Sequence, residues 1–197
     1  AIEEGVSTNP ILHSFQKTVK EYNIERKLID NFLNSMEMDL DTNSHERNSY
    51  DNYVDGSAEA VGLMCLKVFC KGNQEKYDKL EYPARMLGAA FQKVNFLRDI
   101  KSDFEERGRI YLPGVHDVNY ISNENKIALE KEVEKEFSEA LEGIKKLPAG
   151  VKLGVYSAYL YFYILFTKIR EADLNELMEK RVRVSNFNKL LLLLKSY

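Results

Sequence analysis

A column of polar side chains interrupts an otherwise apolar stretch in the middle of this chain, and it limits the possible folds. Gln92, Asn95, Asp99 and Asp103 follow one another at intervals of three, four and four residues. On an α-helix this spacing stacks all four side chains on one face. The flanking residues 88–91, 94 and 97 are all apolar or glycine. We therefore expect a helix that is buried over much of its circumference, with the polar column in a packed interior or a cleft.

The residue types in this column indicate a site for a hard cation. Two carboxylates four residues apart are most often solvated surface, and that is the alternative interpretation of Asp99 and Asp103. Carboxylates that face a cavity must instead be paired or must coordinate a metal ion. Oxygen ligands suit Mg²⁺ (or Mn²⁺), which typically takes one or two carboxylates together with water and substrate phosphates. The column therefore predicts half of a metal–diphosphate site.

Residues 92–113 resemble the second aspartate-rich motif of the squalene/phytoene synthase family, QxxNxxRDxxxD followed by RIYLP. Residues 53–64, YVDGSAEAVGLM, are similar to the YxxGSAExVGLM helix of that family, and a weaker similarity extends to residues 181–185. The resemblance covers nearly the whole chain and implies a single, partial synthase domain over residues 1–197. It implies an all-α isoprenoid synthase fold, in which a helical bundle surrounds a deep apolar cavity.

The resemblance also implies an activity, the head-to-head joining of two prenyl diphosphates with release of diphosphate. The sequences of the two motifs resemble bacterial phytoene synthases more than squalene synthases. This resemblance implies that two molecules of geranylgeranyl diphosphate are joined to phytoene through prephytoene diphosphate, in carotenoid biosynthesis. The alternatives are a squalene or dehydrosqualene synthase that uses farnesyl diphosphate, and a non-catalytic helical assembly factor of the same fold. The intact polar column argues against the assembly factor.

Transferred position by position, the resemblance assigns roles within the column. Asn95, Asp99 and Asp103 would be metal ligands, with Asp99 and Asp103 as the catalytic carboxylates. Gln92 and Arg98 would contact the diphosphate of the substrate, where Arg98 contributes a fixed cationic fork.

The resemblance assigns four further substrate-binding residues outside the column. Tyr53 and Tyr161 would line the cavity; the alternative for each is a core tyrosine whose hydroxyl is satisfied. Arg109 and Tyr111 directly follow the motif helix and would close the pocket, or they could simply anchor the loop.

One expected part of the family pattern does not appear. Family members carry a first DxxxD motif on an earlier helix, which faces the second motif across the cavity. Glu3 and Glu4 lie outside any apolar periodic segment, and Asp39 and Asp41 have the wrong spacing for one helical face. We therefore expect an N-terminally truncated portion of a synthase that is inactive alone and that covers its exposed apolar faces by self-association.

The overall charge excludes an electrostatic preference for nucleic acid, because 28 basic residues oppose 31 acidic ones for a net charge of −3. Cys65 and Cys70 point to different faces of one expected helix, which predicts two packing residues without a disulfide and a cytoplasmic setting. The longest apolar run, residues 151–166, is shorter than the roughly 20 residues of a membrane span. Peripheral contact with a membrane remains compatible with the sequence, because isoprenoid substrates and products are hydrophobic.

Apolar periodicity predicts helices throughout the chain and no hairpins. In the first half we expect a helix that begins at Asn9–Pro10, a second helix near residues 28–36, a loop over 41–49, a helix from about 50 to 69, and the motif helix from residue 80 or 83 to about 107. The first helix would bury one stripe, made of Ile11, Leu12, Phe15 and Val19.

In the second half we expect a helix over about residues 123–146 whose many charges are solvated. Its inward residues would be Ile127, Val133, Phe137, Leu141 and Ile144. The helix after residue 150 is apolar nearly all round, which predicts a central position. The five consecutive leucines at 190–194 would pack on a core in a complete protein, whereas in a fragment they would be exposed.

Overall fold

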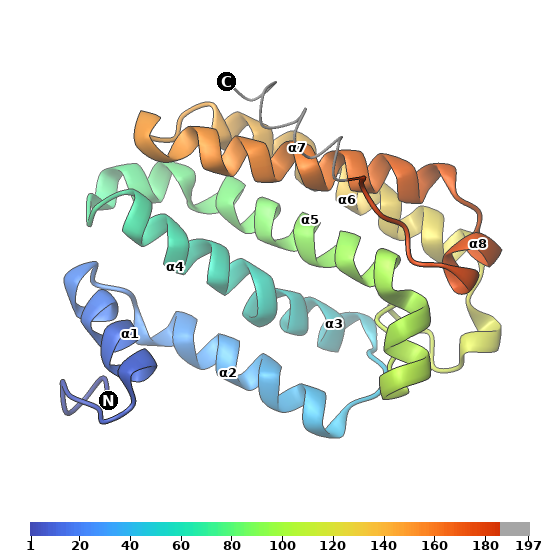
Figure 1. Ribbon diagram of the computed structural model, residues 1–197, viewed down its shortest axis with the longest axis horizontal. Coiled ribbons are helices and arrows are strands. Elements are labelled where there is room, and N and C mark those ends of the chain that lie inside the picture. The colour runs from blue at the N-terminus through green and yellow to red at the C-terminus, as the bar shows by residue number, and fades with distance from the viewer. Residues whose placement is uncertain (186–197) are drawn as a thin grey trace.

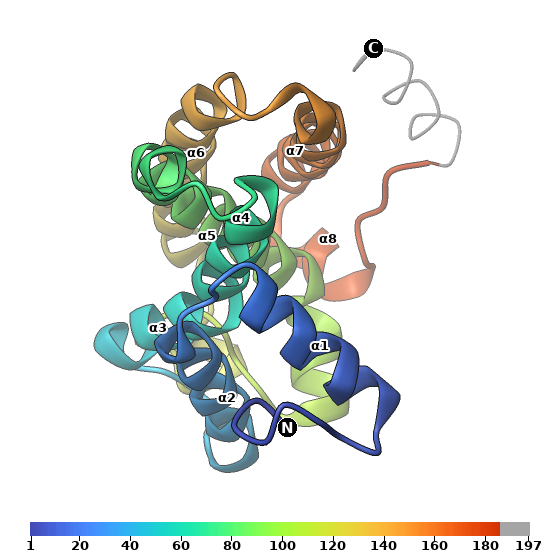
Figure 2. The same ribbon diagram turned by 90° about the vertical axis from the view of Figure 1, so that its left-hand side faces the viewer.

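The computed structural model describes residues 1–185, and this part of the chain is all-α (Figures 1 and 2). Its first half contains α1 (Pro10–Glu21), α2 (Arg26–Asp41), α3 (Arg47–Val54), a π-helical turn η1 (Asp55–Glu59) and α4 (Ala60–Phe69). Its second half contains α5 (Gln74–Arg107), a 3₁₀ turn η2 (Val118–Tyr120), α6 (Asn123–Ile144), α7 (Ala149–Glu171) and α8 (Leu174–Glu179). The all-α prediction is confirmed for this part of the chain, and the prediction for the leucines at 190–194 lies outside the described residues.

The long helix α5 occupies the middle of the bundle. Figure 1 shows α2, the rod formed by α3 and α4, α5 and α7 running lengthwise in successive layers. The core continues from α5 into α6, where Val94 and Leu97 of α5 share one apolar cluster with Val133 and Phe137 of α6. The motif helix is therefore surrounded by other elements over most of its length, as its apolar flanks predict.

Local signals place the helix ends. The side chain of Asn9 accepts hydrogen bonds from the backbone N–H groups of Ile11 (2.9 Å) and Leu12 (3.3 Å), and Pro10 opens α1 in the usual cap-then-proline manner. Gly108 ends α5 in the left-handed region, with φ of 66°. A left-handed residue at this position favours glycine, so the predicted end of the motif helix is confirmed.

The start of the motif helix differs from the prediction. The helix begins at Gln74 rather than near residue 80, and the side chain of Asn73 caps it by accepting a hydrogen bond from the N–H of Lys76 (2.9 Å). Pro83 lies inside the helix instead of at its start. The proline ring packs against Gly143 of α6, where an added Cβ would come within 2.4 Å of Pro83 Cβ. A glycine opposite the ring therefore makes room for an internal proline.

A π-helical turn interrupts the helix expected over residues 50–69. Two glycines let this turn, η1, pass very close to its neighbours. A Cβ on Gly56 would lie 2.2 Å from the carbonyl oxygen of Asn31 in α2, and a Cβ on Gly88 of α5 would lie 2.6 Å from that of Ala58. The loop predicted over residues 41–49 is also shorter than expected, because α3 already begins at Arg47.

The predicted stripe of α1 is largely wrong. Val19 is buried, but Ile11 is 76% exposed, and Leu12 and Phe15 are also exposed. Among residues 1–185, no element packs closely enough over this stripe to bury it. The period of the apolar residues therefore predicted the helix correctly, but it did not predict which of these residues are buried.

The prediction for α6 is wrong in two respects. Ile127 is exposed, although Val133, Phe137 and Ile144 are buried and Leu141 is partly buried. The charges of α6 are also not all solvated, because Lys126, Glu130 and Glu136 are buried. Lys126 pairs with Glu130 one turn away (2.6 Å). Buried charges are tolerated here because they are paired.

The helix α7 is peripheral rather than central. Of its 23 residues only Tyr159, Leu165, Phe166 and Ile169 are buried. Figure 2 shows it beside α6 at the edge of the bundle. Among the described residues it is the one helix whose length and composition would suffice to cross a membrane, although its continuous apolar run, residues 151–166, is shorter than a span. This is a statement about length and composition alone, since a helix packed on a bundle can meet the same condition.

A buried ionic cluster joins α3, α5 and α6. The Lys93 ammonium of α5 donates hydrogen bonds to Glu132 (2.8 Å) and Glu136 of α6, and Arg47 of α3 pairs with Glu132. Burial of the Glu136 carboxyl raises its pKa to about 7, although the neighbouring Lys93 charge opposes this shift. One oxygen of Glu136 and the hydroxyl of Tyr50 are buried without a hydrogen-bond partner. Ionised Glu136 is therefore incompletely satisfied.

We predict that Glu136→Gln makes the fold less sensitive to pH. Because the folded-state pKa of Glu136 is raised, its stabilising contribution is complete below its ordinary value of 4.5 and is lost as pH rises through about 7. In the wild type, the contribution of Glu136 to the free energy of unfolding should therefore decrease by roughly 2–3 kcal/mol between pH 4.5 and 8. Urea titrations of both proteins at several pH values measure this difference. Glu134→Gln, on the exposed side of α6, is the control, and equal pH profiles for wild type and Glu136→Gln would contradict the prediction.

Candidate active site

The carboxylates of the polar column lie in a polar pocket at the C-terminal end of α5. Asp99 and Asp103 line this pocket, which encloses about 480 Å³. The other lining residues come from the last turns of α5, from α8 and from the segment that follows α8: Arg98, Lys101, Ser102, Glu105, Glu106, Arg107, Glu179, Arg181 and Arg183. Five basic and five acidic side chains therefore face the same space.

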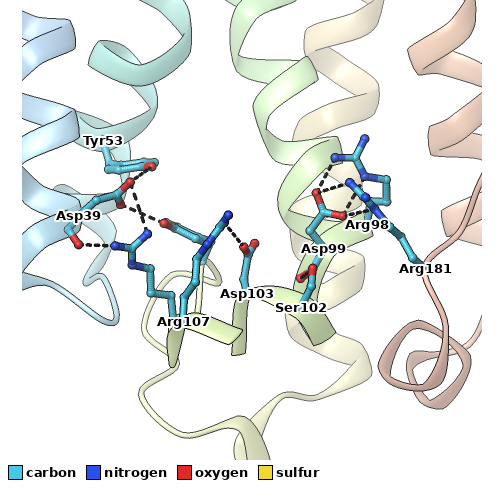
Figure 3. A network of polar contacts seen from close by, with 10 residues as sticks. Asp39, Tyr53, Arg98, Asp99, Ser102, Asp103, Arg107 and Arg181 are labelled. Carbon is cyan, nitrogen blue, oxygen red and sulfur yellow. Dashed lines mark hydrogen bonds and ion pairs between the residues drawn. The ribbon is translucent and has the colours of Figure 1, made fainter. Parts of the chain in front are cut away.

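Two guanidinium groups hold Asp99 (Figure 3). Arg98 donates from Nε to one carboxylate oxygen (2.9 Å) and from its second nitrogen to the other. Arg181 donates from Nη2 to Asp99 Oδ2 (3.2 Å), and its Nε lies 2.6 Å from Oδ1. Burial alone would raise the pKa of Asp99, but the hydrogen bonds and charges of the two arginines outweigh burial and lower it. Asp99 is therefore a carboxylate at neutral pH.

Asp103 lies one turn further along α5 and is mostly buried. It pairs with Arg107 through a single oxygen (3.0 Å). Burial and the nearby charge of Asp99 raise its pKa, and Arg107 only partly offsets them. One turn before Asp99, the side-chain oxygen of Asn95 is buried without a hydrogen-bond partner. The column therefore retains one buried oxygen atom, that of Asn95, that the described residues do not satisfy.

A second polar pocket of about 500 Å³ adjoins the first and shares three arginines with it. Arg98, Arg181 and Arg183 line this second pocket together with Tyr161, residues 182 and 184, and Ser185. No acidic residue is among the described residues that line it. Three guanidinium groups beside one another make this pocket suited to an anion with several oxygens.

Gln92 faces a different space from the carboxylates. It lies at one end of an apolar groove of about 620 Å³ that α4, α5, α6 and α7 form together. Along a helix, seven residues separate Gln92 from Asp99 by about 10 Å. The structure thus places the column on one helix, as predicted, but its two ends open into an apolar groove and a polar pocket. Tyr161, predicted to line the main cavity, lines the arginine-rich pocket instead.

Asp39, near the end of α2, organises a further polar cluster that the sequence did not reveal. The hydroxyl groups of Tyr53 and Tyr111 donate to its two carboxylate oxygens, at 3.1 and 2.9 Å. Arg109 donates to the Asp39 backbone carbonyl, and its guanidinium lies 3.6 Å from the carboxylate. Tyr53 is therefore a core tyrosine with a satisfied hydroxyl. Arg109 and Tyr111 tie the segment after α5 to α2, which supports the loop-anchoring interpretation.

The ring of His45 completes this cluster. It packs against the rings of Tyr53 and Tyr111, with centroids 5.1 and 5.9 Å away. Burial lowers the pKa of His45, and its Nδ1 lies 2.9 Å from the hydroxyl of Ser49. Burial also raises the pKa of both tyrosines, so they remain hydrogen-bond donors to Asp39.

Figure 3 shows Asp103 between the Asp39 cluster and the Asp99 cluster, with Arg107 reaching toward it. The two aspartates that the sequence singled out thus share one end of the bundle with a third, Asp39. The sequence signal for Asp39 is weak, because its nearest acidic neighbour is two residues away and points to another face of the helix. Arg181 and Arg183 are brought to the site by the turn after α8.

We predict that Asp39→Asn destabilises the fold, because it removes the charge that two tyrosine hydroxyls and Arg109 share. Loss of a partly buried, charge-assisted network of this size should cost about 1–3 kcal/mol. Asp41→Asn, at an exposed position two residues further along, is the matched control. Urea unfolding of both variants measures the difference, and equal stability would show that Asp39 does not hold the segment after α5 in place.

The comparisons with known proteins agree with this arrangement. A sequence model of the squalene/phytoene synthase family matches residues 1–116. A presqualene diphosphate synthase of Rhodopseudomonas palustris is 30% identical over 122 residues, which are 60% of this chain and 42% of that protein. A phytoene synthase of Mycobacterium tuberculosis is 27% identical over 110 residues, which are 54% of this chain and 34% of that protein. The chain thus spans less than half the length of these relatives.

Solved structures show the same fold. A dehydrosqualene synthase in complex with a ligand superposes with a TM-score of 0.79 and 22% identity, over 98% of this chain and 72% of that one. A squalene synthase from Alicyclobacillus acidocaldarius gives 0.73 and 17%, over 86% of this chain and 68% of that one. The helical architecture is therefore that of the isoprenoid synthases, and the chain belongs to the squalene/phytoene synthase family.

Proposed function

We propose that this chain carries the diphosphate-binding half of an enzyme that joins two prenyl diphosphates head to head. The observation that supports this most strongly is that a polar pocket and an apolar groove lie near each other along one helix, α5. The arginine-rich pocket at Arg98 suits a diphosphate, and the apolar groove at Gln92 suits a prenyl chain. A ligand with a charged head and a long apolar tail matches both spaces.

The charge balance of the polar pocket favours a divalent cation as cofactor. Its five basic and five acidic lining residues cancel, so a bound diphosphate would leave excess negative charge. Oxygen donors for Mg²⁺ or Mn²⁺ are at hand in Asp99, Asp103 and Asn95, whose side-chain oxygen lacks a partner. Among the described residues no group of three or more His, Cys, Asp or Glu side chains could hold a metal, so phosphate oxygens and water would complete its coordination.

The residues of the chain would then act as follows. A bound divalent cation would stabilise the negative charge that develops on the leaving diphosphate. Arg98 and Arg181 would hold the diphosphate oxygens, and Asp99 would be released from them to bind the cation. The apolar walls of the groove would keep water from the allylic cation, and Phe91, which lines the groove, would offer it an aromatic face.

We further propose that the substrate is geranylgeranyl diphosphate and that the product is phytoene, formed in the cytoplasm or at the membrane surface. The amino-acid sequences of residues 53–64 and 92–99, which resemble those of bacterial phytoene synthases, support this choice. Farnesyl diphosphate is the second candidate, which the similarity to a presqualene diphosphate synthase supports. Because few acidic ligands converge among the described residues, we propose that the 197-residue chain does not turn over by itself.

Binding of a non-reactive thio analogue of geranylgeranyl diphosphate tests the site. We expect calorimetry to show binding in Mg²⁺ that weakens at least tenfold in EDTA. Asp99→Asn should lose most of the Mg²⁺-dependent gain while its melting temperature changes little. Glu105→Gln, an exposed residue of the same pocket, is the control. Equal affinity in Mg²⁺ and EDTA would refute the metal–diphosphate assignment.

A product assay tests the reaction. The protein expressed from its own gene and the 197-residue chain are each incubated with Mg²⁺ and either geranylgeranyl or farnesyl diphosphate. We expect a C40 hydrocarbon from the protein expressed from its own gene and none from the 197-residue chain. Release of diphosphate without carbon–carbon coupling would contradict the proposed transferase, and a C30 product would favour the second substrate.

A further inference from the structure

The three predicted metal ligands differ in how far the protein already occupies their oxygens. Asn95 has a buried side-chain oxygen without a partner, and Asp103 pairs with one guanidinium through a single oxygen. Asp99 is different, because Arg98 and Arg181 each reach both of its carboxylate oxygens. The two guanidinium charges also repel an approaching cation. A metal ion therefore reaches Asp99 only after one of the two arginines has moved away.

The two arginines differ in how readily they can leave Asp99. Arg98 is the neighbour of Asp99 on α5, and its side chain is only 18% exposed. Arg181 belongs to the segment after α8, and its side chain is 49% exposed. Figure 3 shows it reaching Asp99 from that segment. Arg181 is therefore the partner that a ligand can draw away with less rearrangement of the bundle.

The backbone on both sides of Arg181 is fixed to the bundle. Before it, Lys101 of α5 donates a hydrogen bond to the carbonyl of Glu179 (2.9 Å). After it, Lys168 of α7 donates one to the carbonyl of Arg183 (3.5 Å). A change of partner at Arg181 therefore requires its side chain to turn and does not require this segment to detach.

The guanidinium of Arg181 has an alternative partner close by. Arg181 lines the polar pocket that contains Asp99 and also lines the arginine-rich pocket. No acidic residue is among the described residues of the arginine-rich pocket. A diphosphate bound there would offer Arg181 several anionic oxygens in place of the Asp99 carboxylate.

We propose that Arg181 makes metal binding at Asp99 depend on diphosphate. Without an anion, Arg181 occupies the oxygens of Asp99 and keeps a divalent cation away. With diphosphate in the arginine-rich pocket, Arg181 pairs with the diphosphate and leaves Asp99 to the cation. Because such coupling is reciprocal, the cation also strengthens the binding of diphosphate. This inference rests on the proposed function, since it concerns the same metal–diphosphate site, and it adds that the metal cannot bind first.

The binding of Mn²⁺ alone to the full 197-residue chain tests this dependence, and electron paramagnetic resonance measures it. We compare wild type with Arg181→Gln and with Lys180→Gln. The second variant removes the same charge one residue away, at a side chain that pairs with Glu176 (3.5 Å) and does not line the polar pocket. We expect Arg181→Gln to bind Mn²⁺ at least tenfold more tightly than wild type, and Lys180→Gln to stay within twofold of wild type.

A second titration uses the preformed complex of Mn²⁺ with inorganic diphosphate, and calorimetry measures its binding to the same proteins. We expect wild type to bind this complex at least tenfold more tightly than Mn²⁺ alone. Arg181→Gln should lose most of that difference, because its Asp99 is already accessible to the metal without diphosphate.

Equal affinity of wild type and Arg181→Gln for Mn²⁺ alone would overturn the inference, and so would an equal gain in Lys180→Gln. If wild type still binds the diphosphate complex in either case, the proposed metal–diphosphate site stands without the dependence on Arg181. If wild type binds neither Mn²⁺ nor the complex, the site and the inference both fail. Should circular dichroism show that Arg181→Gln is unfolded, Arg181→Lys replaces it. A single ammonium is a point charge without the fork that reaches both oxygens, so a gain of at least threefold then decides.

Discussion

The close approach of η1 to α2 and α5 is the contact on which the rest of the bundle depends. Gly56 and Gly88 remove the side chains that would otherwise hold these elements apart. With no Cβ at either point, the backbone of η1 lies against both helices, which places α5 at the centre. Earlier in α5, five residues before Gly88, the ring of Pro83 fits against Gly143 of α6. Small residues thus set the spacing of the layers, and the apolar groove is the space that remains between them.

The position of α5 also explains how one helix can carry two polar systems. Lys93 faces α6 and is neutralised there by the partly buried Glu132 and the buried Glu136. Asp99, six residues later, points toward a different side of the helix and is neutralised by Arg98 and Arg181. The first system is enclosed by packed helices, whereas the second lines a pocket. Only the second adjoins open space that a ligand could enter, so the candidate site is assigned to that end of α5.

The sequence predicted what short-range physics determines. The all-α class, the cap at Asn9 and the end of α5 at Gly108 follow from periodicity, capping and backbone preference, and all three are confirmed. The predictions failed where a neighbouring element decides the outcome. The apolar stripe of α1 is exposed at Ile11, and the charged helix α6 buries Lys126, because burial depends on the packing partner rather than on the period of the pattern.

The candidate site also contains residues that could be predicted from local sequence and residues that could not. The spacing of Asn95, Asp99 and Asp103 is local to one helix and could be predicted, although their roles as metal ligands remain a prediction. Asp39 could not be found, because its partners Tyr53 and Tyr111 lie 14 and 72 residues away. The turn at Gly108 brings them together, since it reverses the chain after α5 and directs Arg109 and Tyr111 back to α2. Arg107 pairs with Asp103 and Arg109 with Asp39, so each of these three aspartates has a guanidinium partner, and Asp99 has two. That surplus positive charge lies where the arginine-rich pocket begins, which makes Asp99 the carboxylate whose partners a diphosphate could most readily recruit.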